Sequence, residues 1–304
     1  MRCWVVGVCL CLIVVTSGCQ SFSQLLARRG GAADASRLMQ GGTDALHDGR
    51  LGQAESLLSR AAQTRPRDPR IRENLAHALA GQGKLEQAIE NMSRAVEKSH
   101  GDPLLNVQLG QLYLQAGRTV PASRQAAIAL EQNRKLPEAW VLKAETELAR
   151  NNLETALADF QRALGYSGNL IDSQMKVAMI QRKLGKPMRA LSTLENLLQQ
   201  YPNDKQPEPA VLLASNVLLD LQQHEQAIEI LTAATNRRNA TSESFVQLSR
   251  IQLAAGQQSQ ARLTVAKASS KYPDQSELQD LLAQMQRSDE RVASVNLDAQ
   301  EMIR

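Results

Sequence analysis

The chain has 304 residues, of which 43% are hydrophobic, 22% are charged and only 3% are aromatic, and its formal net charge is +4. So small a charge and so few aromatic rings argue against a nucleic-acid-binding protein, which needs cations for phosphates and rings for stacking on bases. The four cysteines, Cys3, Cys9, Cys11 and Cys19, all lie at the N-terminus. No disulfide framework or cysteine-based metal site is therefore expected further along the chain.

Residues 1–18 have the organisation of an export signal. Arg2 precedes the uncharged apolar segment 3–15, and small polar residues follow it. The segment fits a signal peptide and is shorter than the roughly 20 residues that a helix needs to cross a bilayer. Its end, Thr16-Ser17-Gly18-Cys19, resembles the lipobox of bacterial lipoproteins, although Thr16 stands where that family usually has leucine.

The lipobox resemblance implies cleavage before Cys19 and attachment of lipid to its thiol, with residues 19–34 as a tether. One acyl chain binds a membrane only reversibly, whereas several chains on one cysteine hold it permanently. Gln20, in the position where aspartate would signal retention, implies sorting to the outer membrane in an organism that has one. Two alternatives remain: an ordinary secretory signal cleaved nearby, with Cys19 a bystander, and an uncleaved anchor.

From residue 35 the sequence repeats itself, mostly every 34 residues. One column is always alanine: Ala54, Ala88, Ala122, Ala156, Ala190, Ala227 and Ala261. Twelve positions earlier stands a small residue: Gly42, Ala76, Gly110, Ala144, Ala178, Ser215 and Ser249. Between them lies a turn column: Gly49, Gly83, Gly117, Asn151, Gly185, Gln222 and Gly256. Apolar residues at three-to-four spacing flank the turn, so each frame predicts helix, turn, helix, with close helix contacts at the small residues.

A 34-residue helix pair with these columns resembles the tetratricopeptide repeat. The best frame, residues 137–170, has the family's signature residues at Trp140, Ala144, Ala156, Phe160 and Ala163. The resemblance implies an all-α fold, a right-handed α-solenoid of about seven helix pairs over residues 35–275. The frames are 35–68, 69–102, 103–136, 137–170, 171–204, 208–241 and 242–275.

Three segments depart from the repeat. Residues 205–207 are an insertion before the sixth frame, where an offset or kink of the stack is expected. Residues 276–287 are predicted to form the cap helix that a repeat array needs at an open end. Residues 288–304 have no partner frame and are expected to be a flexible tail.

No arrangement of residues in the array indicates catalysis. There is no phosphate-binding loop, no nucleophile motif and no zinc-binding helix motif. The histidines lie in different frames: His47, His77, His100 and His224. We therefore predict a protein that is not an enzyme and has no metal, cofactor or small-molecule substrate.

The tetratricopeptide resemblance implies that the first helix of each pair lines a concave groove that binds a protein or peptide. The column that faces the groove is Thr43, His77, Gln111, Glu145, Met179, Asn216 and Arg250. Its chemistry varies, so packing does not dictate it, which fits a recognition surface and a merely solvated face equally well. The lysine, asparagine and arginine set with which some members of the family bind a chaperone's C-terminal carboxylate is not reproduced.

Three residues beyond this column stands another, which is apolar in six frames: Leu46, Ala80, Leu114, Leu148, Arg182, Leu219 and Leu253. Arg182 breaks the rule, and local violations of a consistent pattern are where function is expected. Lys176 and Lys183 lie on groove-facing positions of the same predicted helix, which makes a basic patch in the fifth frame.

Two interpretations of Arg182 remain open. In one, Arg182 and Lys176 hold an acidic side chain or a C-terminal carboxylate of a partner, and Met175 and Met179 supply adaptable apolar contact. In the other, Arg182 lays its methylenes over its neighbours and directs its charge to water, toward Asp172 or Glu145. The candidate groove residues are Met175, Lys176, Met179, Arg182, Lys183, Glu145 and Arg250.

Together these features predict a membrane-anchored scaffold or adaptor in bacterial envelope assembly, positioning cell-wall enzymes, envelope proteases or the subunits of a pilus or secretion apparatus. The alternative is a non-catalytic regulatory subunit of an envelope enzyme encoded by a separate chain. The predicted partners are a protein or peptide in the groove and a membrane at Cys19, with no nucleic acid.

Overall fold

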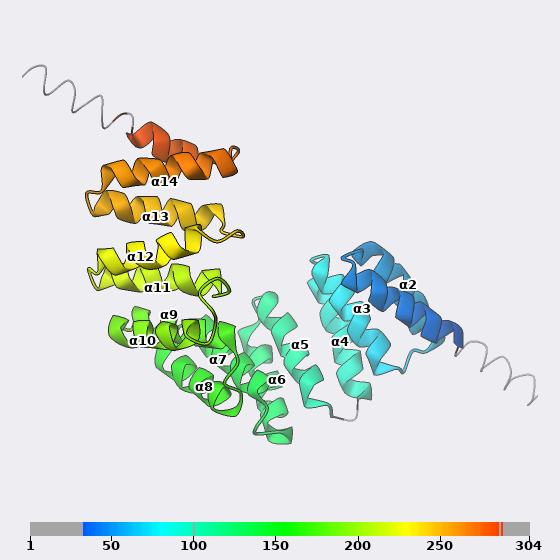
Figure 1. The fold of residues 1–304 in the computed structure, drawn as a ribbon. Coiled ribbons are helices and arrows are strands. Elements are labelled where there is room, and N and C mark those ends of the chain that lie inside the picture. Colours follow the sequence, from blue (N-terminus) through cyan, green and yellow to red (C-terminus); the bar gives the residue numbers. More distant parts are fainter. Residues whose placement is uncertain (1–32, 100, 286, 288–304) are drawn as a thin grey trace, which may run out of the picture. The chain divides into compact units, whose positions relative to one another are not determined.

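The computed structural model describes residues 33–99, 101–285 and 287. Every regular element in these residues is an α-helix (Figure 1). The prediction of an all-α repeat array is therefore confirmed. The predicted signal peptide, the lipidation site Cys19, most of the tether and the tail at 288–304 lie outside the described residues.

The helices follow one another in consecutive antiparallel pairs joined by short turns. The first helix occupies residues 33–47 and the last described one residues 276–285, inside the predicted cap segment. Between them lie α2 (Leu51–Thr64), α3 (Pro69–Gly81), α4 (Leu85–Lys98), α5 (Pro103–Gln115), α6 (Thr119–Gln132), α7 (Pro137–Ala149), α8 (Leu153–Tyr166), α9 (Ile171–Lys183), α10 (Pro187–Leu198), α11 (Glu208–Asp220), α12 (His224–Thr235), α13 (Ser242–Ala254) and α14 (Gln258–Lys271).

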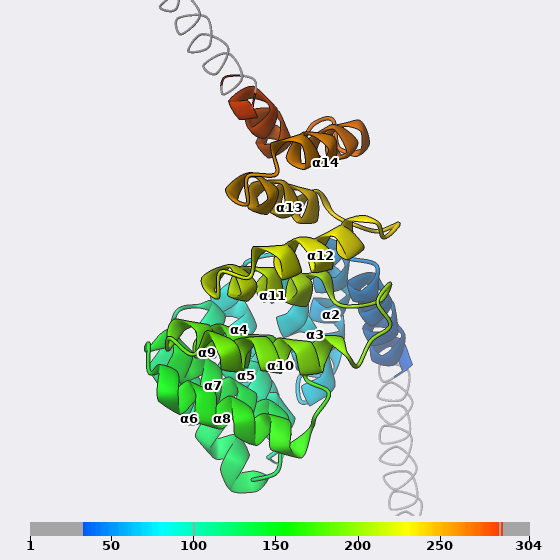
Figure 2. The ribbon, with the colours of Figure 1, turned by 60° about the vertical axis from the view of Figure 1, so that its left-hand side comes forward.

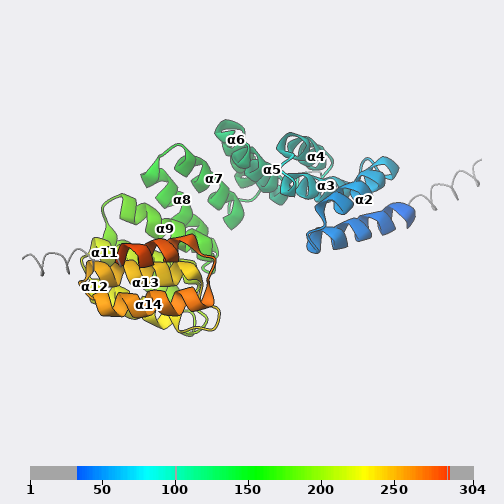
Figure 3. The same ribbon diagram turned by 90° about the horizontal axis from the view of Figure 1, so that it is seen from above.

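The chain divides into two compact units, Met1–Tyr166 and Ser167–Arg304. In the described part of unit 1, the helix at 33–47 and helices α2 to α8 stack pair upon pair (Figure 3). Its largest fully buried side chains are mostly aliphatic: Leu58, Ile71, Met92, Leu142 and Phe160. This composition follows from the scarcity of aromatic residues in the sequence.

Unit 2 contains α9 to α14 and the helix at 276–285, which lies against the last pair (Figure 2). That terminal helix buries Leu278, Leu281 and Met285 in one cluster with Phe245 and Val265. Without it, the apolar face of the last pair would be open to water, so the terminal helix closes this end of the array.

The turn column adopts the backbone conformation that its residues predict. Its five glycines have φ between 69° at Gly185 and 77° at Gly83, and its two other members, Asn151 and Gln222, have φ of 62° and 61°. These values lie in the left-handed region, which glycine adopts without steric cost and asparagine tolerates. Each first helix therefore ends at this position and the chain turns into the second helix.

The small columns lie where helices approach most closely. All seven residues of the alanine column have no exposed surface. In the column twelve positions earlier, a Cβ added at Gly42 would lie 2.5 Å from Cγ of Leu58, and one added at Gly110 would lie 2.3 Å from Cδ2 of Leu142. Packing against these large side chains explains why the two frames have glycine where others have alanine or serine.

Two adjacent glycines in the helix at 33–47 provide a matched test of this packing. Gly42→Ala is expected to leave the protein less stable than Gly41→Ala by about 1–3 kcal/mol, because only the former drives a methyl group into Leu58. A methyl group at Gly41 meets Cδ1 of Leu57 at an ordinary contact distance of 3.5 Å. Both variants share the gain in helix propensity, roughly 0.5–1 kcal/mol. Chemical denaturation measures the difference, and equal stabilities would refute the close approach.

The three inserted residues are accommodated in the loop before α11. Gln206 in this loop donates from Nε2 to the Leu198 carbonyl oxygen at 3.3 Å. Arg237, after α12, donates to the carbonyl and side-chain oxygens of Gln206, both at 2.9 Å. Helices α10 and α11 still pack on one another across the insertion.

Glu208, the first residue of α11, connects the loop region to the next pair. Its carboxylate accepts hydrogen bonds from the Thr241 amide at 3.1 Å and the Thr241 hydroxyl at 2.7 Å, and from the Ser244 hydroxyl. Burial opposes ionisation of Glu208, but these hydrogen bonds and the charge of Arg237 outweigh it and lower its pKa. This carboxylate therefore serves to hold successive helix pairs together.

Candidate functional site: the face of the first helices

The groove-facing column lies on the first helix of each pair, and none of its members is buried. Met179 on α9 is 44% exposed, and Leu104 on α5 is 46% exposed, so both first helices present a large apolar side chain to water. In the groove-facing column, His77, Gln111 and Arg250 are exposed as well, whereas Thr43 is half-buried. This face is therefore accessible along each unit, in contrast to the alanine columns.

In unit 1, hydrogen bonds connect neighbouring first helices across this face. Asn74 of α3 donates from Nδ2 to Oγ1 of Thr43 at 3.0 Å. Gln108 of α5 donates from Nε2 to Oε1 of Glu73 on α3, also at 3.0 Å. These polar side chains connect neighbouring helices, so each already has a hydrogen-bonding partner within the chain.

Unit 2 repeats the arrangement with different residues. Gln247 of α13 donates from Nε2 to Oδ1 of Asn216 at 3.0 Å and to the Leu212 carbonyl oxygen at 3.2 Å, both on α11. Arg250 of α13 lies 3.8 Å from Glu277 of the terminal helix. The variable column thus contains residues that connect one helix pair to the next.

Arg182, which breaks the apolar column, forms an ion pair with Asp220, the last residue of α11. Its Nη2 donates to Oδ1 at 3.0 Å and its Nε donates to Oδ2. The two side chains are 38% and 37% exposed. The hydrogen bond raises the pKa of Arg182 and, against the effect of burial, lowers that of Asp220.

Asp172, one of the two intramolecular partners predicted for Arg182, is therefore wrong, and the other, Glu145, belongs to unit 1. Asp172 precedes Arg182 by ten residues on the same helix, which is about 15 Å along the axis at 1.5 Å per residue. Asp220 belongs to the next first helix, 38 residues later instead of 35 because of the insertion. Because Arg182 is already paired, a partner's carboxylate would have to displace Asp220 to bind it.

The structure brings five of the predicted site residues together on α9: Met175, Lys176, Met179, Arg182 and Lys183. Met179 and Lys183 are exposed, and the other three are half-buried. Arg250 lies two first helices further on, on α13, and Glu145 is on α7 of the other unit. Of the five predicted site residues on α9, those open to a ligand are thus chiefly Met179 and Lys183, flanked by Met175.

Arg182→Leu is expected to change the free energy of unfolding of the protein at pH 7 by less than about 1 kcal/mol, because a half-exposed ion pair contributes roughly 0.2–1 kcal/mol and leucine restores the apolar column. The lowered pKa of Asp220 means that the pair stabilises above the ordinary aspartate pKa, about 3.9, and that this contribution is lost as pH falls through the folded-state pKa.

The difference in stability between wild type and Arg182→Leu should therefore shift in favour of the variant between pH 5 and pH 2. Urea denaturation at several pH values measures it, and Asp220→Asn is the matched control. If the difference does not change with pH in this range, the ion pair contributes nothing to folding.

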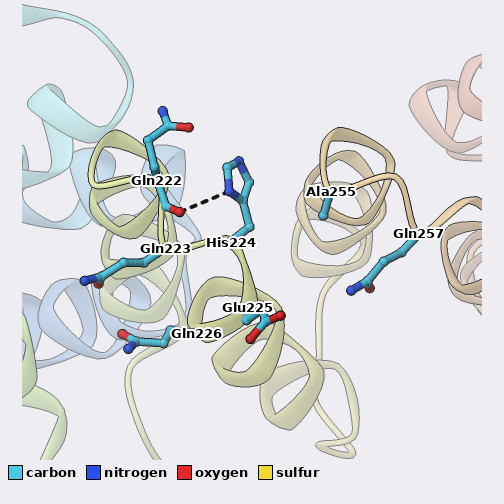
Figure 4. Close-up of a pocket in the computed structure, with 7 residues that line it drawn as sticks. All are labelled: Gln222, Gln223, His224, Glu225, Gln226, Ala255 and Gln257. Carbon is cyan, nitrogen blue, oxygen red and sulfur yellow. Dashed lines mark hydrogen bonds between the residues drawn. The ribbon is translucent and has the colours of Figure 1, made fainter.

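A pocket that the sequence did not indicate lies between the α11–α12 turn and the α13–α14 turn (Figure 4). Its volume is about 510 Å³, and side-chain amides line it, including those of Gln222, Gln223 and Gln257. Nδ1 of His224 lies 3.2 Å from the Gln222 carbonyl oxygen. Because amide side chains dominate this lining, the pocket offers chiefly hydrogen bonding.

The described residues contain no group of three or more histidine, cysteine, aspartate or glutamate side chains placed to hold a metal ion. None of the helices in the described part of the chain has both the length and the apolar character needed to span a bilayer.

Comparison with known families agrees with the geometry. Models of the tetratricopeptide repeat match residues 45–104, 79–146 and 172–204. This chain is a tetratricopeptide repeat protein. Its repeats have the paired helices, the left-handed turns and the small columns described above. Tetratricopeptide repeat proteins are scaffolds that bind other proteins or peptides, typically without catalysing a reaction, and this chain is such a protein-binding scaffold.

Two solved structures show the same fold. A tetratricopeptide repeat protein from Parabacteroides merdae is 19% identical, with a TM-score of 0.60 over 84% of this chain and 99% of that one. The APC/C hetero-tetramer Cut9–Hcn1 gives 18% identity and a TM-score of 0.59 over 75% of this chain and 44% of that one. No protein with a curated description matches this sequence.

Proposed function

We propose that this tetratricopeptide repeat protein is a lipid-anchored scaffold of the bacterial cell envelope, which holds a partner protein against the face of its first helices. The proposed binding role rests on the difference in burial between the alanine column and the groove-facing column. The alanine column is buried in every frame, whereas the groove-facing column varies and is accessible throughout. A surface that packing does not constrain is available for recognition.

Within this face, α9 offers a contact surface that combines apolar and charged side chains. Met179 is 44% exposed beside the half-buried Met175, and methionine adapts its shape to a bound surface. Lys183 adds an exposed positive charge on the same helix, which favours a partner segment that combines apolar and acidic residues. Burial of methionine side chains by a partner would supply most of the affinity, and the charge would supply orientation.

The proposed anchor rests on the sequence. A short apolar segment followed by Thr-Ser-Gly-Cys, with no cysteine after residue 19, has the organisation of a lipoprotein signal. A scaffold tethered in this way would hold its partner near the membrane surface. Cell-wall enzymes, envelope proteases and the subunits of a pilus or secretion apparatus are partners of the kind expected there.

Site-specific photo-crosslinking in the native organism tests the binding role. A photoreactive amino acid at position 179 is expected to give a discrete cross-linked product in the envelope fraction, which mass spectrometry identifies. Leu263, 72% exposed on the second helix α14, is the matched control and should give no such product. Equal cross-linking at both positions, or none at 179, would contradict a partner at this face.

A further inference from the structure

A second concavity lies on unit 1, away from the groove-facing column. It is formed by α6, the loop that follows, α7 and α8, and its volume is about 530 Å³. Trp140 of α7 is one of its walls, and at about 100° per residue Trp140 lies roughly 140° around the helix axis from Glu145, which belongs to the groove-facing column. The two surfaces therefore use different sides of α7. We call this concavity the Trp140 pocket, with walls that include Leu130, Glu131, Arg134, Trp140, Lys143 and Arg162.

The indole of Trp140 is held in place by polar contacts on several sides. Its Nε1 donates a hydrogen bond to the Arg134 carbonyl oxygen at 2.8 Å. Lys143 Nζ and Arg162 Cζ each lie 5.0 Å from the centre of the ring, within the range of a cation–π interaction. The ring and the two cations thus form one fixed assembly that needs no ligand to order it.

Asp159 of α8 forms ion pairs with both cations, Lys143 and Arg162. Its carboxylate is almost wholly buried, with 1% of the side chain exposed, and it lies 3.0 Å from Arg162 Nη1 and 3.3 Å from Lys143 Nζ. Lys143 and Arg162 themselves remain 35% and 56% exposed. Each cation therefore turns part of its charge toward Asp159 and keeps further N–H groups facing water.

The pocket carries an excess of positive charge. Arg134 is exposed at its edge, and within the described part of the chain its guanidinium makes no ion pair. The cationic side chains here are those of Arg134, Lys143 and Arg162. The carboxylates are those of Asp159 and Glu131, so the formal charge of this group is +1. Leu130 and the indole ring give the same pocket an apolar wall. One carboxylate next to one apolar group matches this surface, whereas a nucleic acid requires a row of cations for successive phosphates.

We propose that the Trp140 pocket binds a protein segment in which an aspartate or glutamate stands next to an aliphatic or aromatic residue. The carboxylate accepts charge-assisted hydrogen bonds from Arg134 and from the outward N–H groups of Arg162. The neighbouring apolar side chain covers the indole ring and Leu130. This site is independent of the proposed groove on α9, so one molecule of the scaffold could hold two protein segments at once.

Trp140 itself reports on the site, because the chain contains only one other tryptophan, Trp4. In the full chain with Trp4→Phe, the probes are pools of amidated octapeptides that alternate Asp or Glu with Leu or Phe in a Gly/Ser background. These pools should change the emission of Trp140 in a saturable way. Matched pools with Asn or Gln in place of the acids should bind at least about tenfold more weakly.

Arg134→Glu is expected to weaken binding of the acidic pools by about tenfold or more, because it reverses the charge at the rim. Its backbone carbonyl still accepts the Trp140 hydrogen bond, so folding is retained, which far-UV circular dichroism checks. Arg67→Glu makes the same charge change at an exposed position between α2 and α3 and should leave the affinity unchanged.

Several outcomes would overturn the proposal. They are no emission change with any acidic pool, equal affinity for the amide pools, or an Arg134→Glu variant that binds like the parent. A further set of Asn or Gln pools has a free C-terminal carboxylate. If only this set binds, the pocket is a site for chain termini instead of acidic side chains. An emission change with vesicles of anionic lipid but not with peptides would assign the pocket to a membrane surface.

Discussion

Replacing Phe160 by alanine is expected to lower the free energy of unfolding by about 3–5 kcal/mol, among the largest effects of any single substitution in this chain. Phe160 is fully buried on α8. Its removal leaves a cavity in unit 1 that the surrounding helices fill only partly, and the loss of buried apolar surface adds to that cost.

The repeat itself supplies the comparison. The equivalent position of every frame is fully buried: Leu58, Met92, Ala126, Phe160, Leu194, Leu231 and Val265. Three frames have leucine there, so Phe160→Leu should cost clearly less than Phe160→Ala. Denaturation of both variants and of wild type measures the order.

Because contacts in such an array are mainly between neighbouring pairs, the damage should also be local. Hydrogen exchange in Phe160→Ala should accelerate most in α7, α8 and the adjacent α6, and least in α13 and α14. A uniform loss of protection over the whole chain would contradict the repeat-by-repeat view of its stability.

Much of this fold follows from the sequence because repeats average out local uncertainty. A single glycine such as Gly185 is a weak signal, but a column with five glycines and one asparagine in seven frames is a strong one. Gln222 shows the limit of residue preference: it adopts φ of 61° although glutamine does not favour it, because the surrounding helix pair dictates the turn.

Contacts between frames were harder to predict than the frames. The Arg182–Asp220 ion pair joins residues whose spacing is shifted by the insertion, so alignment of the repeats did not bring them together. Gly110 likewise contacts Leu142 of the following frame, whereas Gly42 contacts Leu58 of its own. Such differences depend on the sizes of side chains on neighbouring helices, which a column-by-column analysis treats separately.

Only the location of the candidate groove, on the first helices, could be predicted from the sequence. Its residues could be placed on the first helices, and the structure has them on that accessible face. Which of them are engaged within the chain could not be predicted, because Asn74–Thr43 and Gln247–Asn216 pairs depend on the spacing of adjacent helices. The Trp140 pocket could not be predicted for a related reason. Trp140 is a signature residue of the repeat, and the other residues of the pocket come from several elements.

The second large effect concerns Cys19, whose replacement by alanine is expected to abolish lipid attachment and leave an uncleaved precursor. The reason is chemical: the thiol sulfur forms the thioether to the lipid, and alanine has no nucleophile at that position. In the processed wild type, which would lack the apolar segment, the acyl chains would supply most of the affinity for the membrane, at about 0.8 kcal/mol for each buried CH₂.

Mass spectrometry of the membrane fraction tests this directly, since the wild type should begin at an acylated Cys19. Two controls separate the lipidation site from its surroundings. Cys11→Ala removes another thiol from the same N-terminal stretch and should leave processing intact. Thr16→Leu restores the residue that lipoproteins usually have there and should be processed at least as well. A mature wild-type chain that begins beyond residue 19, without acyl groups, would show that Cys19 is not the anchor and that the scaffold meets its partner without one.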